Sequence, residues 1–441
     1  MRFLTLLIFC GLAGQAHGWG PHPQITQAAL DTLGADHPFK TILGPHANRM
    51  PQYCWMADWR TTLPKAGTAQ FYADDFLLFP GYPKHEDHLC PHVEKTYAPY
   101  FRRAYEAIRM ESPENAARWI GAILHFVEDT GSPPHAARVL GSLHTKGENW
   151  VKGDLIKIDD YQPALLGEDI DSAVAGLEKR MAGLIAFSKA RFERIKPLLE
   201  ADDRATTEPI VLESALETSR VVADLFHTLG QLAEKFPAKG ATLHGKIASP
   251  KSHTATYSPA KIMIHGTDGS TLADIEGNFE FRGLPPGKRT LQVERPGCAI
   301  FLREIDLRVG VETKVDVQLK EGSLVRNADF SLRWSQPDAP DHWTQRKDIW
   351  QSEWIPLEKT TDYRVHIEWR RGGTNTAELI FAPRTQYGAP RITSKPFSPG
   401  KPEQTFKGSE RFAYAKVVLR GEDDPANSFR VVNFRKLKPV K

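Results

Sequence analysis

Apolar residues recur at helical spacing through the N-terminal half of the chain. Residues 115–127 carry Ala, Trp, Ile, Leu and Phe three and four positions apart, and the preceding Ser-Pro-Glu at residues 112–114 resembles a helix cap with proline at the first helical position. Two long amphipathic stretches follow, at residues 171–199 and 208–235. The pattern predicts an all-α domain over residues 19–235.

The helical spacing gives way to alternation after FPAKGAT, residues 236–242, where Pro and Gly predict a linker. Over residues 243–320, short alternating runs such as KIMIHG, NFEF and TLQVE are separated by Gly, Pro and Asp turns, which indicates a small antiparallel β-sandwich. Alternating runs continue over residues 321–441 and predict a second sandwich. The expected fold class is therefore multidomain, with one all-α domain followed by two all-β sandwich domains.

Several tryptophans lie among the alternating runs of the last segment: Trp343, Trp350, Trp354 and Trp369. Their rings either fill the core of the sandwich or form an exposed face that stacks on sugars. A core position is the more common one for such rings. The pattern favours the core and keeps a carbohydrate or surface polymer as a possible partner of the sandwiches.

Composition and charge narrow the class of protein. The chain has 441 residues, enough for about three domains of roughly 150 residues each. Hydrophobic residues make up 41% and charged residues 25%, as in globular proteins, which excludes whole-chain disorder. Lys+Arg 57 against Asp+Glu 54 gives a net charge of +3. This is too balanced for a protein that holds duplex nucleic acid along a basic face, so a nucleic acid substrate would have to be held locally.

Residues 1–18, MRFLTLLIFCGLAGQAHG, have the pattern of a secretory leader. Arg2 precedes an apolar run, and the small residues Ala16 and Gly18 predict cleavage before Trp19. A lipid-anchored leader through Cys10 is the alternative, which the bulky neighbouring Phe9 disfavours. No later run approaches the roughly 20 apolar residues of a membrane helix. We expect a secreted, periplasmic or cell-surface protein without a transmembrane segment.

Three cysteines follow the predicted cleavage site. In an oxidising compartment Cys54 and Cys90 could pair, whereas Cys298 lies in a strand-rich segment and is expected to be a small buried hydrophobe. The chain has no CxxC, which excludes a cysteine-based zinc site.

The segment LHFVEDTGSPPHAARVLGSLHTKGENW carries the strongest chemical signal. His125 and Asp129 are four positions apart on a predicted helix and share one face, so both can chelate one cation. His135 follows a Pro-Pro turn, and His144 and Glu148 repeat the same spacing on the next predicted helix. Imidazole and carboxylate are the ligands of zinc where cysteine is absent. One such pair arises often by chance, but two pairs with a histidine between them predict a zinc site.

The order H-x3-D-x5-H followed by H-x3-E resembles the zinc-dependent phospholipase C family and the related fungal single-strand nucleases. That resemblance implies an all-helical fold with three zinc ions in a cleft. His125 and Asp129 match ligands of the first zinc, and Trp19 and His22 match ligands of the third zinc, with Asp129 bridging. In these enzymes the free amine and carbonyl oxygen of an N-terminal tryptophan chelate zinc, and the predicted cleavage exposes Trp19. The second zinc would be held by His135, His144 and Glu148.

The same family also needs an aspartate and a histidine between these two blocks. YCWMADWR resembles its Trp-Ala-Asp segment, which makes Asp58 the expected ligand and the group that orients or deprotonates the attacking water. Asp74 in FYADDF is the alternative. For the histidine, PKHEDHLCPH offers three candidates. His88 is favoured over His85, and both stay in the predicted ligand set, with His92 as the third.

The resemblance implies hydrolysis of a phosphodiester by a metal-bound hydroxide, with a phospholipid or a nucleic acid as substrate. A phospholipase C-type activity is favoured, and a 3′-nucleotidase and single-strand nuclease is the alternative. Aromatic residues near the predicted ligands could form a cage for a quaternary ammonium group or a stacking platform for bases: Tyr53, Trp55, Trp59, Tyr72, Phe76, Phe79 and Tyr82. An alternative of another class is a surface-attached binding protein with structural zinc.

Two further resemblances concern the β-rich segments. DIEGNFEFRGLPPGKRTLQVERPG resembles the carboxypeptidase regulatory-like domain, a transthyretin-like β-sandwich, which implies a scaffold or adhesive module over residues 243–320. LVRNADFSLRW opens a segment similar to jelly-roll, galactose-binding-like modules over residues 321–441.

Overall fold

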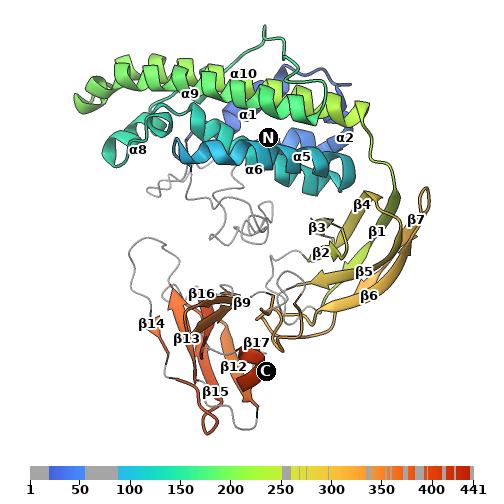
Figure 1. Cartoon of the computed structure of the whole chain (residues 1–441). Coiled ribbons are helices and arrows are strands. Elements are labelled where there is room, and N and C mark those ends of the chain that lie inside the picture. Colours follow the sequence, from blue (N-terminus) through green and yellow to red (C-terminus); the bar gives the residue numbers. More distant parts are fainter. Residues whose placement is uncertain are drawn as a thin grey trace, which may run out of the picture.

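The computed structural model describes residues 19–54, 88–250 and 260–437, apart from short gaps at 268, 275, 296, 334–338, 342, 353–354, 358–359, 371–375, 383–391, 395, 410–413 and 422–423. Helices make up the N-terminal part, and strands dominate from Ala241 onward (Figure 1). The predicted division into a helical N-terminal half and a β-sheet C-terminal region is confirmed. The helical segments are α1 (His22–Asp31), α2 (Pro38–Leu43), η1 (Gly44–Arg49), α3 (Met50–Tyr53), η4 (His92–Thr96), α5 (Tyr97–Met110), α6 (Pro113–Gly131), α7 (Pro133–Ala136), α8 (Ser142–Asn149), η5 (Gly153–Leu155), α9 (Ile170–Glu200) and α10 (Arg204–Lys235).

Helix α6 is the central helix of the bundle. The Ser112 side chain accepts a hydrogen bond from Asn115 N at 3.3 Å, and Pro113 is the first helical residue, as the sequence predicts. Every residue of α6 from Asn115 to Gly131 is buried, because α1, α3, α5, α9 and α10 all pack against it. A Cβ at Gly121 would lie only 2.3 Å from the carbonyl oxygen of Tyr53. Glycine at this position therefore lets α3 cross α6 closely, one helical turn from His125.

The two longest helices, α9 and α10, pack side by side along the bundle (Figure 1). Asp169 and Ser172 form a capping box at the start of α9. Helix α10 begins about one turn before the predicted position, because Asp203 caps it by accepting a hydrogen bond from Thr206 N. Pro209 therefore lies inside the helix.

The first β region has two sheets with a shared core. One sheet has the order β4-β1-β7, with β8 also on β1, and the other has the order β3-β2-β5-β6. Leu243, Ile262, Phe281 and Leu291, from strands of both sheets, belong to one apolar cluster. The pairing departs from the expected antiparallel pattern, since β7 and β8 both run parallel to β1. The intervening strands supply the long connection that parallel pairing needs. The strands are β1 (Ala241–Ala248), β2 (Lys261–Ile264), β3 (Ser270–Leu272), β4 (Asn278–Leu284), β5 (Gly287–Glu294), β6 (Phe301–Leu307), β7 (Glu312–Lys314) and β8 (Val317–Gln318).

The second β region also has two sheets around one core. Their orders are β14-β13-β16-β10-β9, with β11 on β16, and β15-β12-β17. Trp343 and Trp350 belong to the buried core and Trp369 packs against it, so Trp343 and Trp350 are not available to stack on a sugar. Trp354 lies outside the described residues. The elements are β9 (Trp343–Arg346), β10 (Ile349–Ser352), β11 (Ile355–Pro356), β12 (Asp362–Trp369), β13 (Thr376–Ala382), β14 (Ile392–Thr393), β15 (Glu403–Lys407), β16 (Tyr414–Arg420), α11 (Pro425–Ser428) and β17 (Phe429–Lys436).

Polar contacts join the helical bundle to the first β region. The guanidinium of Arg118 donates to the carbonyl oxygen of Ala273 at 3.3 Å, and Asn115 Nδ2 donates to Thr271 Oγ1 at 2.8 Å. A backbone bridge links Glu111 to Phe281 on β4. The chain between α10 and β1, where the linker is predicted, is therefore not the only connection between these two parts.

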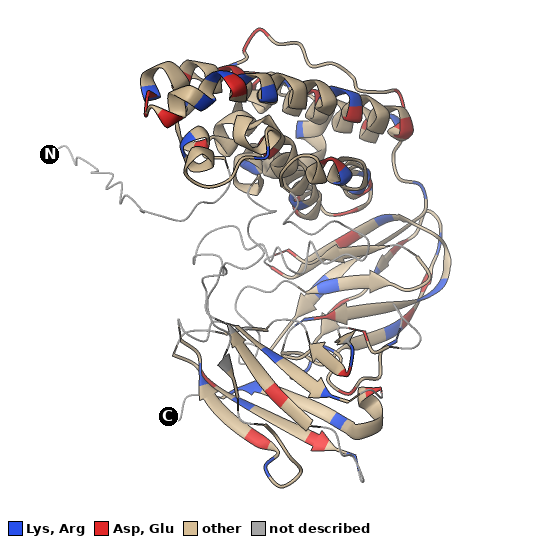
Figure 2. Ribbon diagram, turned by 60° about the vertical axis from the view of Figure 1, so that its left-hand side comes forward, with Lys and Arg blue, Asp and Glu red and all other residues tan. Residues whose placement is uncertain are grey.

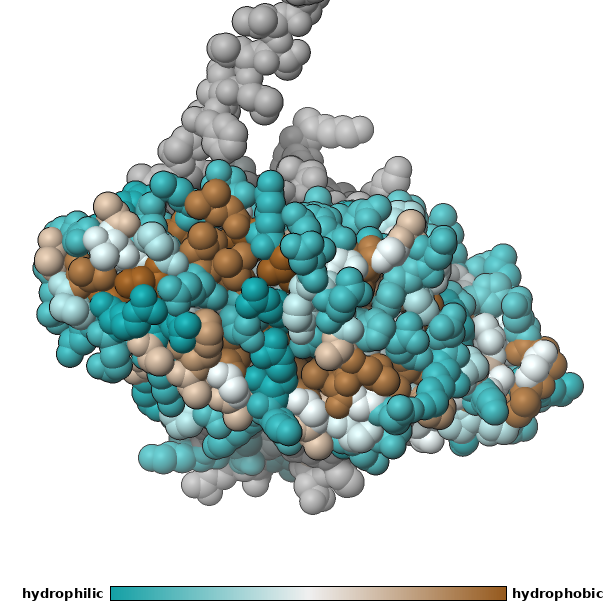
Figure 3. Space-filling model, turned by 90° about the horizontal axis from the view of Figure 1, so that it is seen from above, coloured by the Kyte–Doolittle hydropathy of each residue, from teal (hydrophilic) through white to brown (hydrophobic). Residues whose placement is uncertain are grey.

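Lys and Arg residues lie among Asp and Glu residues in both the helical part and the β part of the described chain (Figure 2). Seen from the side of α9 and α10, apolar residues form separate patches among hydrophilic ones (Figure 3). Within the described residues, none of the helices combines the length and apolar character needed to cross a membrane.

Candidate metal centre

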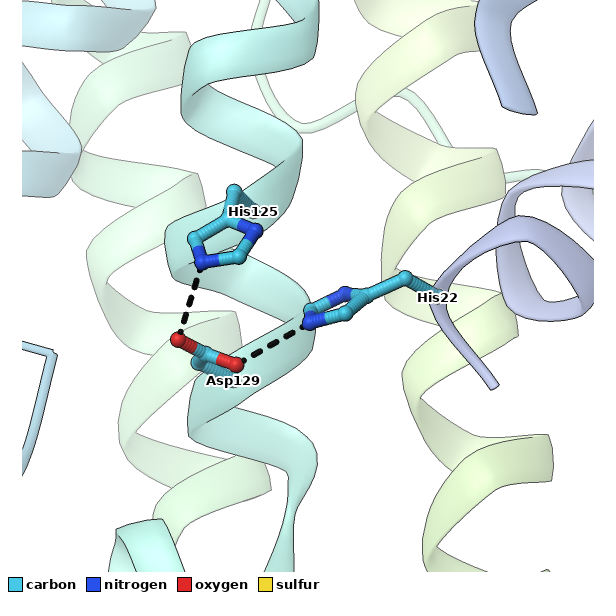
Figure 4. A group of neighbouring side chains, drawn as sticks. All are labelled: His22, His125 and Asp129. Carbon is cyan, nitrogen blue, oxygen red and sulfur yellow. Dashed lines mark hydrogen bonds and ion pairs between the residues drawn. The ribbon is translucent and has the colours of Figure 1, made fainter. Parts of the chain in front are cut away.

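Helices α1 and α6 bring three predicted ligands together (Figure 4). His125 and Asp129 lie one turn apart on α6, with His125 Nε2 3.2 Å from Asp129 Oδ2. His22, at the start of α1, faces the same carboxylate, with Nε2 3.1 Å from Oδ1. All three residues are fully buried, and each offers a ligand atom within 4.8 Å of the others.

His88 extends this group towards solvent. Its Nδ1 lies 2.6 Å from Asp129 Oδ2 and 3.2 Å from His125 Nε2. The His88 side chain is 12% exposed, whereas those of Asp129 and His125 are fully buried. The partly exposed His88 therefore marks a side of the group that solvent can reach.

A second group lies on α7 and α8. Glu148 Oε1 is 2.6 Å from His135 Nε2 and 3.1 Å from His144 Nε2. The ligand atoms of these three residues also lie within 4.8 Å of one another. His135 lies on the short helix α7, directly after Pro133 and Pro134.

The two groups are direct neighbours. His135 Nδ1 lies 3.8 Å from Asp129 Oδ2 and donates a hydrogen bond to the carbonyl oxygen of His88 at 3.2 Å. Asp129 and His88 from the first group and His135 from the second therefore form one continuous polar centre.

Four histidine rings of this centre share one orientation, whereas His88 faces Asp129 through Nδ1. In each of the four, Nδ1 bonds to an oxygen outside the ligand group while Nε2 faces a carboxylate of the centre. The partners of Nδ1 are the carbonyl oxygens of Cys54 for His125 at 2.8 Å, His88 for His135 at 3.2 Å and Val139 for His144 at 2.8 Å, and the carboxylate of Glu128 for His22 at 2.6 Å. A carbonyl oxygen can only accept, so Nδ1 carries the proton in His125, His135 and His144. This arrangement directs the Nε2 lone pair to the centre, as in histidines that bind metals.

The electrostatics of the centre come from carboxylates in a dry environment. Burial disfavours charge on Asp129, yet His135 and His125 hold the pKa of Asp129 well below its usual range. Burial also opposes the charge on His135, but Asp129 and Glu148 outweigh it and raise the pKa of His135 to about 9. Hydrogen bonds from His135 and His144 likewise overcome burial and lower the pKa of Glu148. The carboxylates therefore stay negative and attract positive charge, which a divalent cation could supply in place of protons.

The donor set fits zinc. Each group combines imidazole nitrogen with carboxylate oxygen, both of which zinc accepts. Each group offers three ligand atoms among the described residues, the number found in catalytic zinc sites that keep one position for water.

Trp19 lies at the edge of the centre. It is fully buried, and its carbonyl oxygen accepts a hydrogen bond from His22 N at 3.2 Å. A Cβ added at Gly20 would lie 3.5 Å from the carbonyl oxygen of Glu148. The segment before α1 therefore lies next to His22 of the first group and Glu148 of the second, where the resemblance expects the third zinc.

Other predicted residues fall elsewhere. Asp58, His85 and the alternative Asp74 lie outside the described residues. His92 is exposed at the start of η4. Tyr53 is fully buried, and its hydroxyl bonds to His46 Nδ1 at 3.0 Å, so its ring is part of the core. The remaining candidate aromatic residues, Trp55, Trp59, Tyr72, Phe76, Phe79 and Tyr82, are also outside the described residues.

The prediction for Cys298 is confirmed, whereas the possible disulfide between Cys54 and Cys90 is not formed. Cys298 is buried in the core of the first β region, as predicted. Cys54 and Cys90 are both buried, but no disulfide joins these two described thiols, so the pairing that the sequence allows is not formed. The Cys54 thiol instead donates to the carbonyl oxygen of Pro51 at 3.1 Å.

The sequence analysis missed Glu128 and Thr26. Glu128 is fully buried and receives hydrogen bonds from His22 Nδ1 at 2.6 Å and from Thr26 Oγ1 at 2.5 Å. The only signal in the sequence is a second acidic residue directly before Asp129 in a helix that is otherwise strongly apolar.

Some solved protein structures resemble this chain weakly. Alpha-toxin from Clostridium absonum is 14% identical over 69% of this chain and 96% of its own, with a TM-score of 0.34. Alpha-toxin from an avian strain of Clostridium perfringens is 15% identical over 67% of this chain and 96% of its own, with a TM-score of 0.31. A chain of the type II cohesin-X-dockerin complex from Acetivibrio cellulolyticus is 21% identical over 20% of this chain and 67% of its own, with a TM-score of 0.17.

None of these TM-scores reaches 0.5, so these likenesses carry no information about the chemistry of the centre. No curated protein sequence matches the chain significantly. A family model does match part of it. Residues 242–320 match the model of the carboxypeptidase regulatory-like domain, and the chain therefore contains a domain of that family, as its turn and strand motifs predict.

Proposed function

We propose that the chain is a zinc-dependent hydrolase of phosphodiesters, of the phospholipase C type. One observation carries the proposal: His22, His125, His135 and His144 all bond outward through Nδ1 and face the shared carboxylates Asp129 and Glu148 through Nε2. Surface ion pairs do not require such a shared ring orientation, whereas a histidine that binds metal characteristically donates its other ring N–H to a carboxylate or a backbone carbonyl.

Asp129 would have the central role in such a centre. Its Oδ1 faces His22 and its Oδ2 faces His125 and His88, so each oxygen can serve a different metal ion. His135, His144 and Glu148 would hold the second ion, and Trp19 with His22 the third. Asp58 is the proposed group that binds metal and orients or deprotonates the attacking water.

Zinc ions held there would neutralise phosphoryl oxygens and make a water molecule acidic enough to attack at neutral pH. The chain supplies the rest of the environment. The buried carboxylates fix the ion positions, and the partly exposed His88 and His144, at 12% and 17%, mark the side from which a phosphodiester could enter.

An exposed leucine supports a phospholipid substrate. Leu140 is 73% exposed and lies in the chain between the proposed ligands His135 and His144. A large apolar side chain beside the centre would insert into the acyl region of a lipid surface, where its burial is favourable. The balanced net charge of +3 gives no comparable support for a polymer with many phosphates.

Export and surface attachment complete the proposal. The leader at residues 1–18 would direct the protein out of the cytoplasm, and the two β regions would dock the helical domain to a surface or a carbohydrate polymer. Neither assignment is needed for the chemistry of the centre.

The decisive experiment is a side-by-side assay of the processed, zinc-loaded protein on phosphatidylcholine vesicles and on single-stranded DNA. Zinc-dependent release of phosphocholine is the expected result. Turnover of DNA alone would replace the lipid assignment with the nuclease. Tightly bound zinc without hydrolysis of either substrate would favour the structural-zinc binding protein and contradict the proposal.

A further inference from the structure

Glu128 is a fully buried carboxylate that directly precedes the proposed ligand Asp129 and has no part in the chemistry proposed above. Both of its oxygens are engaged by α1. Oε2 lies 2.6 Å from His22 Nδ1, and Oε1 accepts the hydroxyl hydrogen of Thr26 at 2.5 Å. His22 and Thr26 are themselves fully buried. A charged side chain in such a dry place is costly unless its hydrogen bonds are satisfied, and here α1 satisfies them.

The Nδ1 partner of His22 differs from those of the three other rings that face the centre through Nε2. His125, His135 and His144 donate from Nδ1 to neutral backbone carbonyls. His22 faces a carboxylate instead. A hydrogen bond to a carboxylate is shorter and stronger than one to a carbonyl, and it increases the basicity of the opposite ring nitrogen.

The location of His22 explains why a stronger partner is needed. His22 is the first residue of α1, and the N-cap Pro21 makes no side-chain capping bond. The ring of His22 stacks on that of His125 at 4.6 Å between centroids, but stacking alone allows the ring to rotate in its plane. The carboxylate of Glu128 removes this freedom and leaves Nε2 directed at Asp129.

We propose that Glu128 is a positioning residue that fixes the tautomer and orientation of His22 and so creates the metal site at the start of α1. The inference rests on the proposed function, because it takes His22 as a zinc ligand. It assigns Glu128 to one site only. The site formed by His135, His144 and Glu148 has its own carbonyl partners and should not depend on Glu128.

The test is zinc stoichiometry and affinity of the full-length, processed protein, measured by elemental analysis and by competition with a chromophoric chelator. Glu128→Leu removes both hydrogen bonds of the carboxylate. It is expected to lower the affinity of the protein for one zinc ion by about 10- to 100-fold, while the affinity for the others is unchanged. Glu128→Gln keeps an acceptor for His22 without the charge and should weaken the same zinc by a smaller factor.

Two further variants separate positioning from general damage. Glu111→Gln alters another buried carboxylate, at the contact with the first β region, and should lower thermal stability without changing zinc affinity. If Glu128→Leu prevents folding, Thr26→Val is the substitute, because it keeps the shape of α1 and removes the hydrogen bond to Glu128 Oε1. It should still lower the affinity for the same zinc ion.

A double-mutant cycle with His22→Ala decides whether Glu128 acts through His22. In the His22→Ala background, Glu128→Gln should change zinc binding no further. Unchanged zinc affinity in both Glu128 variants, or an equal loss with and without His22, would overturn the inference. A wild-type protein that binds no zinc would instead contradict the proposed function itself, so the two failures are distinguishable.

Discussion

Asp129 faces His22 across 107 positions of sequence, with Oδ1 3.1 Å from Nε2, while its Oδ2 faces His125 one turn away on the same helix. The carboxylate therefore joins the start of α1 to α6 and presents its two oxygens in two directions. A single residue with this arrangement can serve two metal sites, so a substitution of Asp129 should affect metal binding more than one at any other position of the centre.

Asp129→Asn is expected to remove bound zinc from more than one site and to lower phosphodiester hydrolysis by more than about 100-fold, since changes one shell further from a metal already cost 10- to 100-fold. The substitution keeps the size of the side chain but loses its negative charge. Elemental analysis and an assay on a soluble phosphodiester check both effects. Asp171→Asn, an exposed residue of α9, is the control. Full zinc content in Asp129→Asn would exclude the bridging assignment.

One residue added before Trp19 is expected to reduce zinc content by about one ion per chain. The reason is that the terminal amine, an expected ligand, would move away from His22, although the backbone around Gly20 could stay beside Glu148. Elemental analysis of both proteins provides the measurement, with N-terminal sequencing to establish processing. The same residue added after Lys441 is the control, and equal zinc content in the two proteins would remove Trp19 from the ligand set.

The local part of the centre was predictable from sequence because the α-helix fixes spacing. His125 with Asp129, and His144 with Glu148, are four residues apart, and the helical period alone places each pair on one face. The start of α6 followed from an equally local signal, Ser112 before Pro113.

Long-range contacts were not predictable in the same way. Glu128 meets His22 only because α1 packs against α6, and no spacing rule connects residues 106 positions apart. Cys54 and Cys90 show the reverse case. The predicted export to an oxidising compartment allowed a disulfide between them, but the crossing of α3 over α6 uses the carbonyl of Cys54 to hold His125, and no bond forms between the two thiols.

The parallel pairing of β1 with β7 is a further tertiary effect. Alternation along a strand reports which face is buried and carries no information about the direction of its neighbour. The strands themselves could therefore be located, whereas the order β4-β1-β7 could not.

Leu140→Ser is expected to lower activity on phosphatidylcholine vesicles roughly five- to tenfold, because insertion of one leucine into a lipid surface contributes on the order of 1 kcal/mol or more. Activity on a soluble short-chain phosphodiester should stay the same, since the Leu140 side chain is largely exposed to solvent and is not one of the proposed ligands. Leu302→Ser, in an exposed position of β6, is the control. Equal losses on vesicles and soluble substrate would contradict the surface role of Leu140.

Acid is expected to destabilise the packing of α2 on α10 through two histidines. His37 Nδ1 accepts from Phe39 N at 3.1 Å, so its Nε2 donates to His227 Nδ1 at 2.9 Å, and both rings are needed neutral. Burial, with His227 and Lys40, lowers the pKa of His37 to about 4. An unfolded histidine titrates near 6.5. Between these values only the unfolded chain takes up the proton, so stability is complete above pH 6.5 and falls as the pH drops towards 4.

The variant His37→Asn isolates this effect, because asparagine can still cap α2 but does not titrate. Urea unfolding at pH 7 and pH 4.5 should show that the wild-type protein loses about 1–2 kcal/mol more than the variant over this interval, a value reduced for the partial exposure of the pair. The same pH dependence in both proteins would show that His37 does not control acid stability.

Arg118→Met tests whether the helical bundle and the carboxypeptidase regulatory-like domain unfold as one unit. The buried guanidinium of Arg118 donates to the carbonyl of Ala273 at 3.3 Å and to Glu114 Oε1 at 2.9 Å. Methionine fills the same space but leaves both acceptors without this donor, which should cost about 2–4 kcal/mol of unfolding free energy. Arg102→Met, which breaks the exposed pair with Asp171, should cost no more than about 1 kcal/mol. Calorimetry is expected to resolve one cooperative transition in the wild-type protein and two in Arg118→Met, with unchanged zinc content. A single transition at the wild-type temperature would mean that the two parts are coupled by other contacts, such as the backbone bridge between Glu111 and Phe281.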